Sequence, residues 1–195
     1  MYKYVILLLI IVCDLEIVNA NGVSFGLRGG VISQTFPEEQ GTELWPAAIG
    51  GLVEFKIPNS ALAVRTDIGV GLYQKEQNGI RTTKTDVQLE AGGKYIWKIS
   101  SSETAVYGGE DPYRMGISNG LAIAMHLYNV EEKYADSVVK SPETGIGLHL
   151  LGGVEYLISS YILFAEIGWG NILRGDFFQE KQHWTQLTFM GGVRF

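Results

Sequence analysis

The chain has 195 residues and a formal net charge of −6, with 25 glycines against 5 prolines and 11% aromatic residues. The length suits a single domain with a real core, and an acidic chain without a basic stripe is not a candidate for nucleic-acid binding. Many glycines and aromatic residues favour close-packed strands and tight turns. No segment approaches the roughly eighteen unbroken apolar residues of a membrane helix.

Residues 1–20 are predicted to be a secretory signal peptide. Lys3 supplies the positive start, an apolar run to Cys13 follows, and a small-residue cleavage pattern closes the segment. A lipoprotein anchor at Cys13 is the alternative, but the residue before it is bulky. The exported chain, 21–195, is expected to form one domain without cysteine and therefore without a disulfide.

The exported chain alternates apolar and polar residues with period two, which is typical of strands that have one apolar face. The pattern predicts strands over 23–32, 47–57, 61–74, 85–99, 113–128, 144–157, 161–172 and 184–195. It predicts long polar loops over 33–46, 75–84, 129–143 and 173–183, and turns near 58–60, 100–112 and 158–160. Asn119 interrupts the apolar row of the fifth strand, so a bulge is expected there.

The final strand, residues 184–195, has the clearest pattern. Leu187, Phe189, Val193 and Phe195 share its apolar face, and no polar tail follows. We expect this end to be built into a sheet, because the last residues of a soluble domain normally fray into water. A tilted strand of about ten residues can cross a bilayer. Strands cross only as a closed barrel, since an open edge leaves backbone groups unpaired in hydrocarbon.

With its aromatic terminus and Gly-Gly-Val-Arg-Phe ending, this strand resembles the closing strand of the small eight-stranded outer-membrane β-barrels of the OmpA/OmpX-like superfamily. The resemblance covers the exported chain in pattern and strand rhythm. It implies an all-β, eight-stranded antiparallel up-and-down transmembrane barrel in the outer membrane of a Gram-negative-type bacterium. It also implies that Phe195 is a signal for the barrel-assembly machinery. The implied partners are outer-membrane lipid, lipopolysaccharide and a surface ligand of the loops, for a monomeric barrel.

Charged residues occupy the polar faces of the predicted strands in both signs. Eight strands enclose an interior only wide enough for side chains, and charges shut away from water must be paired. We therefore expect a plugged interior, and a gated or narrow conducting path is the alternative. The predicted interior charge network comprises Arg28, Glu54, Lys56, Arg65, Asp67, Asp86, Glu90, Lys94, Arg114, Glu155, Glu166 and Arg194.

Tyrosine and tryptophan residues are expected at both membrane–water boundaries of such a barrel. Ordinary strand packing is the alternative for some of them. The predicted aromatic girdle consists of Tyr95, Trp97, Tyr113, Tyr156, Tyr161 and Trp169.

The three histidines, His126, His149 and His183, lack the spacing of a metal site. We expect no metal, cofactor or catalytic residue, and interpret the histidines as members of the polar network or of a loop. An outer-membrane lipid A deacylase, which uses a Ser-His-Glu set, is the enzymatic alternative. His126 has no serine next to it, and no Gly-x-Ser-x-Gly elbow is present.

Three functions follow from these patterns. The first is a structural or surface-interaction protein that acts through its loops, and the second is a lipid-modifying enzyme in the same barrel. The third is a soluble, exported, lipocalin-like binding barrel, which would turn its apolar rows inward. One observation separates the membrane barrel from the lipocalin-like barrel. In the membrane barrel the apolar side chains lie outside and the charged side chains lie inside, and the reverse holds in the lipocalin-like barrel. The apolar residues for this test are Leu148, Leu150, Val154, Ile167 and Phe189, and the charged residues are Arg28, Glu90 and Glu166.

Overall fold

The structure is a computed structural model, and it describes residues 22–36, 41–101, 113–158, 161–175 and 182–195. The predicted signal peptide lies outside the described residues. The described residues form eight strands: β1 (Val23–Phe36), β2 (Gly41–Lys56), β3 (Leu62–Gln77), β4 (Ile80–Ser101), β5 (Tyr113–Lys133), β6 (Val138–Ile158), β7 (Tyr161–Gly175) and β8 (Gln182–Arg194). No helix in these ranges is both long and apolar enough to cross a membrane.

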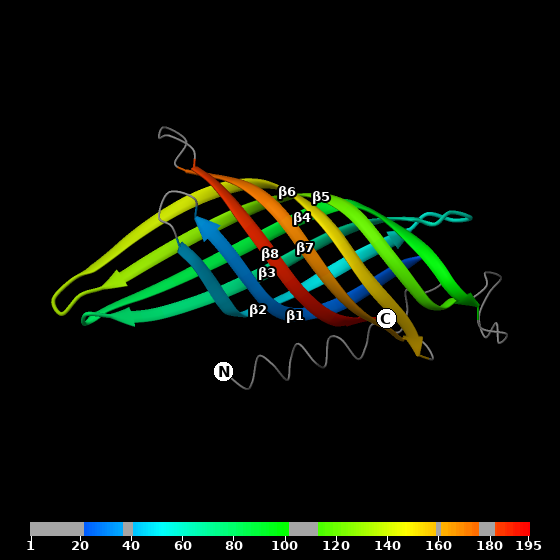
Figure 1. Ribbon diagram of the computed structural model, residues 1–195, viewed down its shortest axis with the longest axis horizontal. Helices are drawn as coiled ribbons and strands as arrows, with labels where there is room; N and C mark the ends of the chain where they lie inside the picture. Colours follow the sequence, from blue (N-terminus) through cyan, green and yellow to red (C-terminus); the bar gives the residue numbers. More distant parts are fainter. Residues whose placement is uncertain (1–21, 37–40, 102–112, 159–160, 176–181) are drawn as a thin grey trace.

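Each strand pairs antiparallel with its neighbours in sequence, and β8 pairs with β1 to close the barrel (Figure 1). At the seam Phe25 and Phe195 exchange two backbone hydrogen bonds of 2.9 Å. The Tyr161 ring stands edge-on to Phe195, with ring centroids 6.5 Å apart. The prediction of an eight-stranded antiparallel barrel with a built-in final strand is confirmed.

The apolar faces of the strands lie outside the barrel and the charged faces lie inside. Leu148 is 51% exposed and its neighbour His149 is 2% exposed, which is the alternation expected of one strand with two environments. The other residues chosen to separate the two kinds of barrel show the same arrangement. Leu150, Val154, Ile167 and Phe189 are exposed, and Arg28, Glu90 and Glu166 are buried. The lipocalin-like hypothesis is therefore wrong, because it requires the reverse arrangement.

Four strands extend beyond the rest of the barrel and were predicted too short. Pairing continues to Gln77 and Ile80 between β3 and β4, and to Lys133 and Val138 between β5 and β6. The predicted loops over 75–84 and 129–143 are thus mostly paired strand, and strand also occupies much of 33–46. These segments are mostly polar on both faces, with Val138 and Val139 as exposed exceptions, so the alternation in hydrophobicity ends there although the backbone ladder continues.

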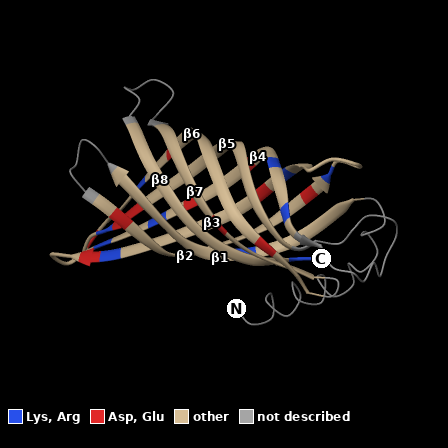
Figure 2. Cartoon of the chain, turned by 45° about the vertical axis from the view of Figure 1, so that its right-hand side comes forward, with Lys and Arg blue, Asp and Glu red and all other residues tan. Residues whose placement is uncertain are grey.

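We call these extensions the projecting sheet, made of 74–77, 80–83, 129–133 and 138–143. Among the described residues, β2 pairs no further along β3 than Leu72, and β7 begins to pair with β6 only at Thr144. The two hairpins therefore stand clear of β2 and β7, as Figure 1 shows at its left edge. Figure 2 shows Lys, Arg, Asp and Glu on this sheet as well as along the barrel strands.

The hairpin between β3 and β4 closes with a two-residue turn. Asn78 and Gly79 have positive φ values of 54° and 75°. Two central residues with positive φ define a type I′ turn, whose twist matches that of the paired strands. The connection predicted as a long loop over 75–84 is therefore a tight hairpin with Asn78 and Gly79 at its bend.

The bulge predicted at Asn119 is wrong. Asn119 pairs in regular register with Tyr95 on β4 and Gly152 on β6. The register shifts instead where Gly30 pairs with Ala48 and Ile32 pairs with Trp45, which places an extra residue in β2. Pro46 lies in this interval and has no N–H to donate to a ladder, which explains why the irregularity falls there.

Candidate functional site

The buried charges of the barrel form three layers. The lowest is a ring at the end that holds the turn between β2 and β3, which we call the short-turn end. Glu54, Lys94, Glu155 and Arg194 come from β2, β4, β6 and β8, so every second strand contributes one side chain. Lys94 Nζ lies 2.6 Å from Glu54 Oε2 and also contacts Glu155. Arg194 contacts Glu54 and donates to Glu155 Oε2 at 2.8 Å. Each cation thus has both carboxylates as partners.

The middle layer is built around Arg65. Its guanidinium forms a bidentate contact with Glu166, one arm of which measures 3.0 Å, and its Nε donates to Asp67 Oδ2 at 2.5 Å. Arg28 approaches the same two carboxylates, at 3.4 Å from Asp67 and 4.0 Å from Glu166. All four side chains are buried. Bidentate Arg–carboxylate pairs are among the strong ion pairs of proteins, and buried charges need such partners.

The upper layer pairs carboxylates with imidazoles. His126 Nδ1 lies 3.0 Å from Asp86 Oδ2, and His149 Nδ1 lies 3.0 Å from Glu90 Oε2. Gln88 donates to the same Glu90 oxygen at 2.9 Å. These imidazoles are 0% and 2% exposed, so they belong to the interior of the barrel and not to its surface.

His149 lies in a cradle of two glycines. A Cβ at Gly170 would stand 2.6 Å from His149 Nε2, and one at Gly147 would stand 3.3 Å from the same atom. Residues with side chains would therefore displace the imidazole from Glu90. Among the described residues, no group of three or more His, Cys, Asp or Glu side chains is placed to hold a metal ion.

Aromatic rings lie above the charged layers, at the end from which the projecting sheet rises. Trp45 is 5.9 Å from Tyr73 and 6.5 Å from Tyr128, and Tyr128 is 5.8 Å from Trp184, measured between ring centroids. Gln34 donates a 2.9 Å hydrogen bond to Gln186 Oε1 on the adjacent strand β8, and a 3.2 Å hydrogen bond across the barrel to the Tyr128 hydroxyl. Trp45 and Tyr128 are almost fully buried.

Sequence reasoning missed this aromatic layer. The inward position of Tyr128 and Trp184 could have been predicted. Tyr128 is two residues from His126 and Trp184 is two residues from Gln186, so each lies on the polar face of its strand. Trp45 could not be found by parity, because the bulge at Pro46 moves it from the outward to the inward face.

The structure buries ten of the predicted network residues inside the barrel: Arg28, Glu54, Arg65, Asp67, Asp86, Glu90, Lys94, Glu155, Glu166 and Arg194. Lys56 is only half-buried, near the end of β2. The side chain of Arg114 lies outside the described part of the structure. His183, by contrast, is exposed near the start of β8, apart from the other two histidines.

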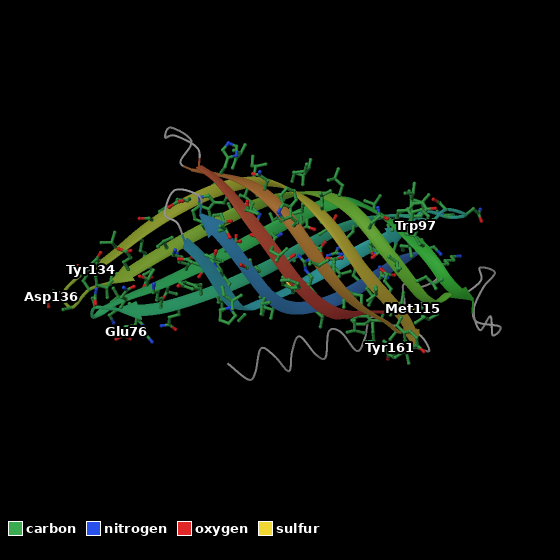
Figure 3. The ribbon with its side chains drawn as sticks, viewed as in Figure 1. Glu76, Trp97, Met115, Tyr134, Asp136 and Tyr161 are labelled. Carbon is green, nitrogen blue, oxygen red and sulfur yellow. The ribbon has the colours of Figure 1, made fainter. Side chains whose placement is uncertain are left out.

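The aromatic girdle residues divide between two levels. Trp97, 57% exposed, and Tyr161, 49% exposed, lie at the short-turn end, as Figure 3 shows. Tyr95 packs on Trp97 with ring centroids 4.6 Å apart, and Tyr156 is exposed on β6. Trp169 pairs with Leu187, and the next outward pair on these strands is polar. It therefore lies toward the opposite boundary. The side chain of Tyr113 is outside the described residues.

The tip of the projecting sheet is solvated. Glu76, Tyr134 and Asp136 lie there together, at the end opposite to Trp97 and Tyr161 (Figure 3). The Tyr134 hydroxyl donates to Glu132 Oε2 at 2.7 Å, and this hydrogen bond raises the pKa of Tyr134. Lys140 pairs with Glu131 at 3.1 Å across β5 and β6, with both side chains open to water.

No protein-family model and no curated protein matches the sequence. Solved structures match the fold over most of both chains. Neisserial surface protein A is 16% identical, with a TM-score of 0.65, and the match covers 89% of this chain and 96% of that one. The attachment invasion locus protein Ail of Yersinia pestis is 12% identical, with a TM-score of 0.56 and coverage of 90% and 99%.

A major outer membrane protein of Thermus thermophilus is 12% identical, with a TM-score of 0.52 and coverage of 89% and 99%. At these identities the matches speak for the fold alone. The chain accordingly has the fold of the small outer-membrane β-barrels, with eight strands, an apolar exterior and a charged interior.

Proposed function

We propose that this chain is an integral outer-membrane protein with a plugged interior, and that it acts at the cell surface through its projecting sheet. The observation that carries the proposal is a change of character along one continuous sheet. Outward side chains of β5 are mostly apolar from Met115 to Leu127 and polar from Asn129 onward. The apolar stretch is long enough to cross a bilayer, which takes roughly 9–11 residues of a strand. The remainder of the strand therefore stands outside the hydrocarbon.

The layered interior supports the plug. Three layers of ion pairs lie below an aromatic layer. The lower, middle and aromatic layers draw side chains from strands on several sides of the barrel, and the upper layer draws them from the consecutive strands β4, β5 and β6. An eight-stranded barrel has room for little else. The same layers support a non-enzymatic role, because both interior imidazoles are held by carboxylates and are shut away from the surface where a lipid substrate would lie.

The projecting sheet supports an encounter with lipopolysaccharide and with a ligand beyond it. Its outward face carries Arg81, Lys133 and Lys140, cations that can contact the phosphates of lipopolysaccharide. The same face also carries Glu76 and Glu131, so it is mixed in charge and not a simple basic patch. At the other end, the backbone pairing of Phe195 with Phe25 supports a role for the terminal residue in closing the barrel during assembly.

Labelling of single cysteines on intact cells tests the orientation. The exported chain has no cysteine of its own if the signal peptide is removed. Asp136→Cys places a thiol on the tip of the projecting sheet, and Lys98→Cys places one on an exposed position near the short-turn end. A membrane-impermeant maleimide should label Asp136→Cys on intact cells and Lys98→Cys only after permeabilisation. Equal labelling of both on intact cells, or labelling of Lys98→Cys alone, contradicts the proposal.

A narrow, gated conducting path is a second candidate, and one observation favours it. Lys94 and Arg194 each contact both Glu54 and Glu155, so either cation can keep one partner while it releases the other. Planar-bilayer recordings separate the two candidates. The plug predicts no steady current from the unmodified chain. Brief openings that become more frequent in Glu155→Gln would favour the gated path.

A further inference from the structure

One polar side chain interrupts the apolar exterior. Asn119 points outward from β5 and is exposed, between Ile117 at 45% and Leu121 at 48% exposure along the same row. Across the strands it faces Tyr95 and Gly152. An amide in contact with lipid tails is unfavourable unless its polar atoms find partners, so this position needs an explanation.

Half of the Asn119 amide is already satisfied. Trp97 Nε1 donates a 2.8 Å hydrogen bond to Asn119 Oδ1. An indole N–H can only donate, so it fixes the amide with its oxygen toward Trp97 and its NH₂ turned away. This is the one hydrogen bond of the Asn119 side chain found within the described ranges. The Tyr95 ring, 4.6 Å from that of Trp97, supports the indole from the side.

Open space adjoins the amide. Gly152 lies directly opposite Asn119, and Gly93 lies diagonally on β4. A Cβ built on Gly93 meets no atom within 4 Å, and one on Gly152 meets only Ile167 Cγ2 at 3.9 Å. Packing within the barrel therefore does not require glycine at either place. Together the two glycines leave a notch beside the Asn119 NH₂ group.

The notch lies at the depth of lipid headgroup and ester oxygens. A strand crosses the hydrocarbon in roughly 9–11 residues. When the crossing of β5 is counted from Leu127, its first apolar outward residue, it ends between Asn119 and Ile117. Trp97 lies at the same end of the barrel as Met115 and Tyr161 (Figure 3), and tryptophan and tyrosine prefer this boundary.

We propose that Asn119 binds a phospholipid of the leaflet at the short-turn end, by donating from its Nδ2 to an oxygen of that lipid. Trp97 orients the amide, and the notch over Gly93 and Gly152 admits the first carbons of an acyl chain. The acceptor is either a glycerol ester carbonyl or a phosphate oxygen, since both lie at this depth and both accept hydrogen bonds. This inference rests on the membrane insertion argued above.

Native mass spectrometry of the folded exported chain in detergent tests the proposal, with palmitoyl-oleoyl phosphatidylethanolamine as the added lipid. Asn119→Leu continues the apolar row and removes both donors. Asn171→Leu is the matched control, because Asn171 is also an exposed, outward asparagine but lies on β7 toward the opposite boundary. Dialkyl phosphatidylethanolamine, which lacks ester carbonyls, identifies the acceptor. A heat-modifiability gel on each sample checks that the barrel is folded.

We expect the unmodified chain and Asn171→Leu to retain one lipid at collision energies that strip it from Asn119→Leu, with at least a threefold difference in the bound fraction. If the unmodified chain retains the dialkyl lipid more weakly than the ester lipid, the acceptor of the Asn119 hydrogen bond is the ester carbonyl. If it retains both lipids equally, the acceptor is a phosphate oxygen. If Asn119→Leu retains the lipid as well as the unmodified chain does, the inference is overturned while membrane insertion stands. A chain that does not insert into vesicles overturns both.

Discussion

The barrel and the projecting sheet belong to one continuous ladder of strands, yet their ion pairs lie in opposite surroundings. In the barrel, the Arg65–Glu166 pair is almost fully buried, with side chains 4% and 5% exposed. In the projecting sheet, the Lys140–Glu131 pair has side chains 63% and 37% exposed. Both pairs join a basic side chain to a glutamate, but Arg65 and Glu166 meet across the lumen from β3 and β7, whereas Lys140 and Glu131 face each other on adjacent strands. The comparison therefore contrasts a buried ion pair inside the barrel with a solvated one on the projecting sheet.

The largest expected effect comes from removing one member of a buried pair. Glu155→Ala leaves Lys94 and Arg194 short of a partner in the lower ring. Breaking a buried ion pair costs about 3–5 kcal/mol, because an uncompensated charge stays behind. We expect a loss of that size in the free energy of unfolding, measured by urea titration in phospholipid vesicles. Glu131→Ala in the projecting sheet is the control and should cost less than about 1 kcal/mol.

A new charge on the outward face compares the surroundings of the barrel exterior with those of the projecting sheet. Leu150 is half exposed in the middle of the outward row of β6. Arginine at the lipid-facing midplane of a barrel costs about 2–4 kcal/mol, so Leu150→Arg should lower the free energy of unfolding in vesicles by that amount. Thr83→Arg, on the same face of β4 in the projecting sheet, should change it by less than about 0.5 kcal/mol. Equal losses would show that both positions meet the same solvent.

A smaller effect is expected from filling the cradle of His149. In Gly170→Ala the new methyl group would stand 2.6 Å from His149 Nε2, so the imidazole must move away from Glu90. Overpacking of this kind costs about 1–3 kcal/mol. Gly93→Ala, which meets no atom within 4 Å, should be neutral or slightly stabilising. Thermal denaturation in detergent micelles compares the two, and a larger loss in Gly93→Ala contradicts the packing.

The smallest effect should come from the tip of the projecting sheet. Gly79 has a φ of 75°, and a left-handed conformation costs an L-residue with a side chain about 1–2 kcal/mol. Gly79→Ala should open the β3–β4 hairpin locally and leave the barrel intact. Amide hydrogen exchange should accelerate at 74–83 and stay unchanged at 62–70. Faster exchange throughout β3 would mean that the projecting sheet and the barrel unfold as one unit.

The sequence predicted the parts of the fold that depend on contrast between two faces. Alternation gave the number of strands and the inward position of residues such as Glu90 and Glu166, because a strand between lipid and a charged interior must differ on its two sides. The projecting sheet has water on its outward face and mostly polar residues on both faces, so its strands carried no such contrast and were predicted as loops. The bulge at Pro46 hid Trp45, since one added residue reverses the parity of a strand.

Asn119 shows a different limit of sequence reasoning. A polar residue in an apolar row indicates an irregularity, and a bulge was the available local explanation. Its partner, Trp97, lies 22 positions away along the chain on a neighbouring strand. The register that brings the two together depends on the pairing of β4 with β5, which local alternation does not specify.

The central claim is that the apolar faces meet lipid and the charged faces are enclosed, and one measurement on the unmodified chain tests it directly. Methyl-labelled protein in phospholipid nanodiscs is titrated with a lipid-soluble nitroxide, and broadening is read at each Leu, Ile and Val methyl by NMR. The account predicts strong broadening at Leu148 and Leu150, which are 51% and 50% exposed, and little at Leu52 and Ile172, which are 4% and 0% exposed. Strong broadening at Leu52 and Ile172, with Leu148 and Leu150 spared, would contradict it.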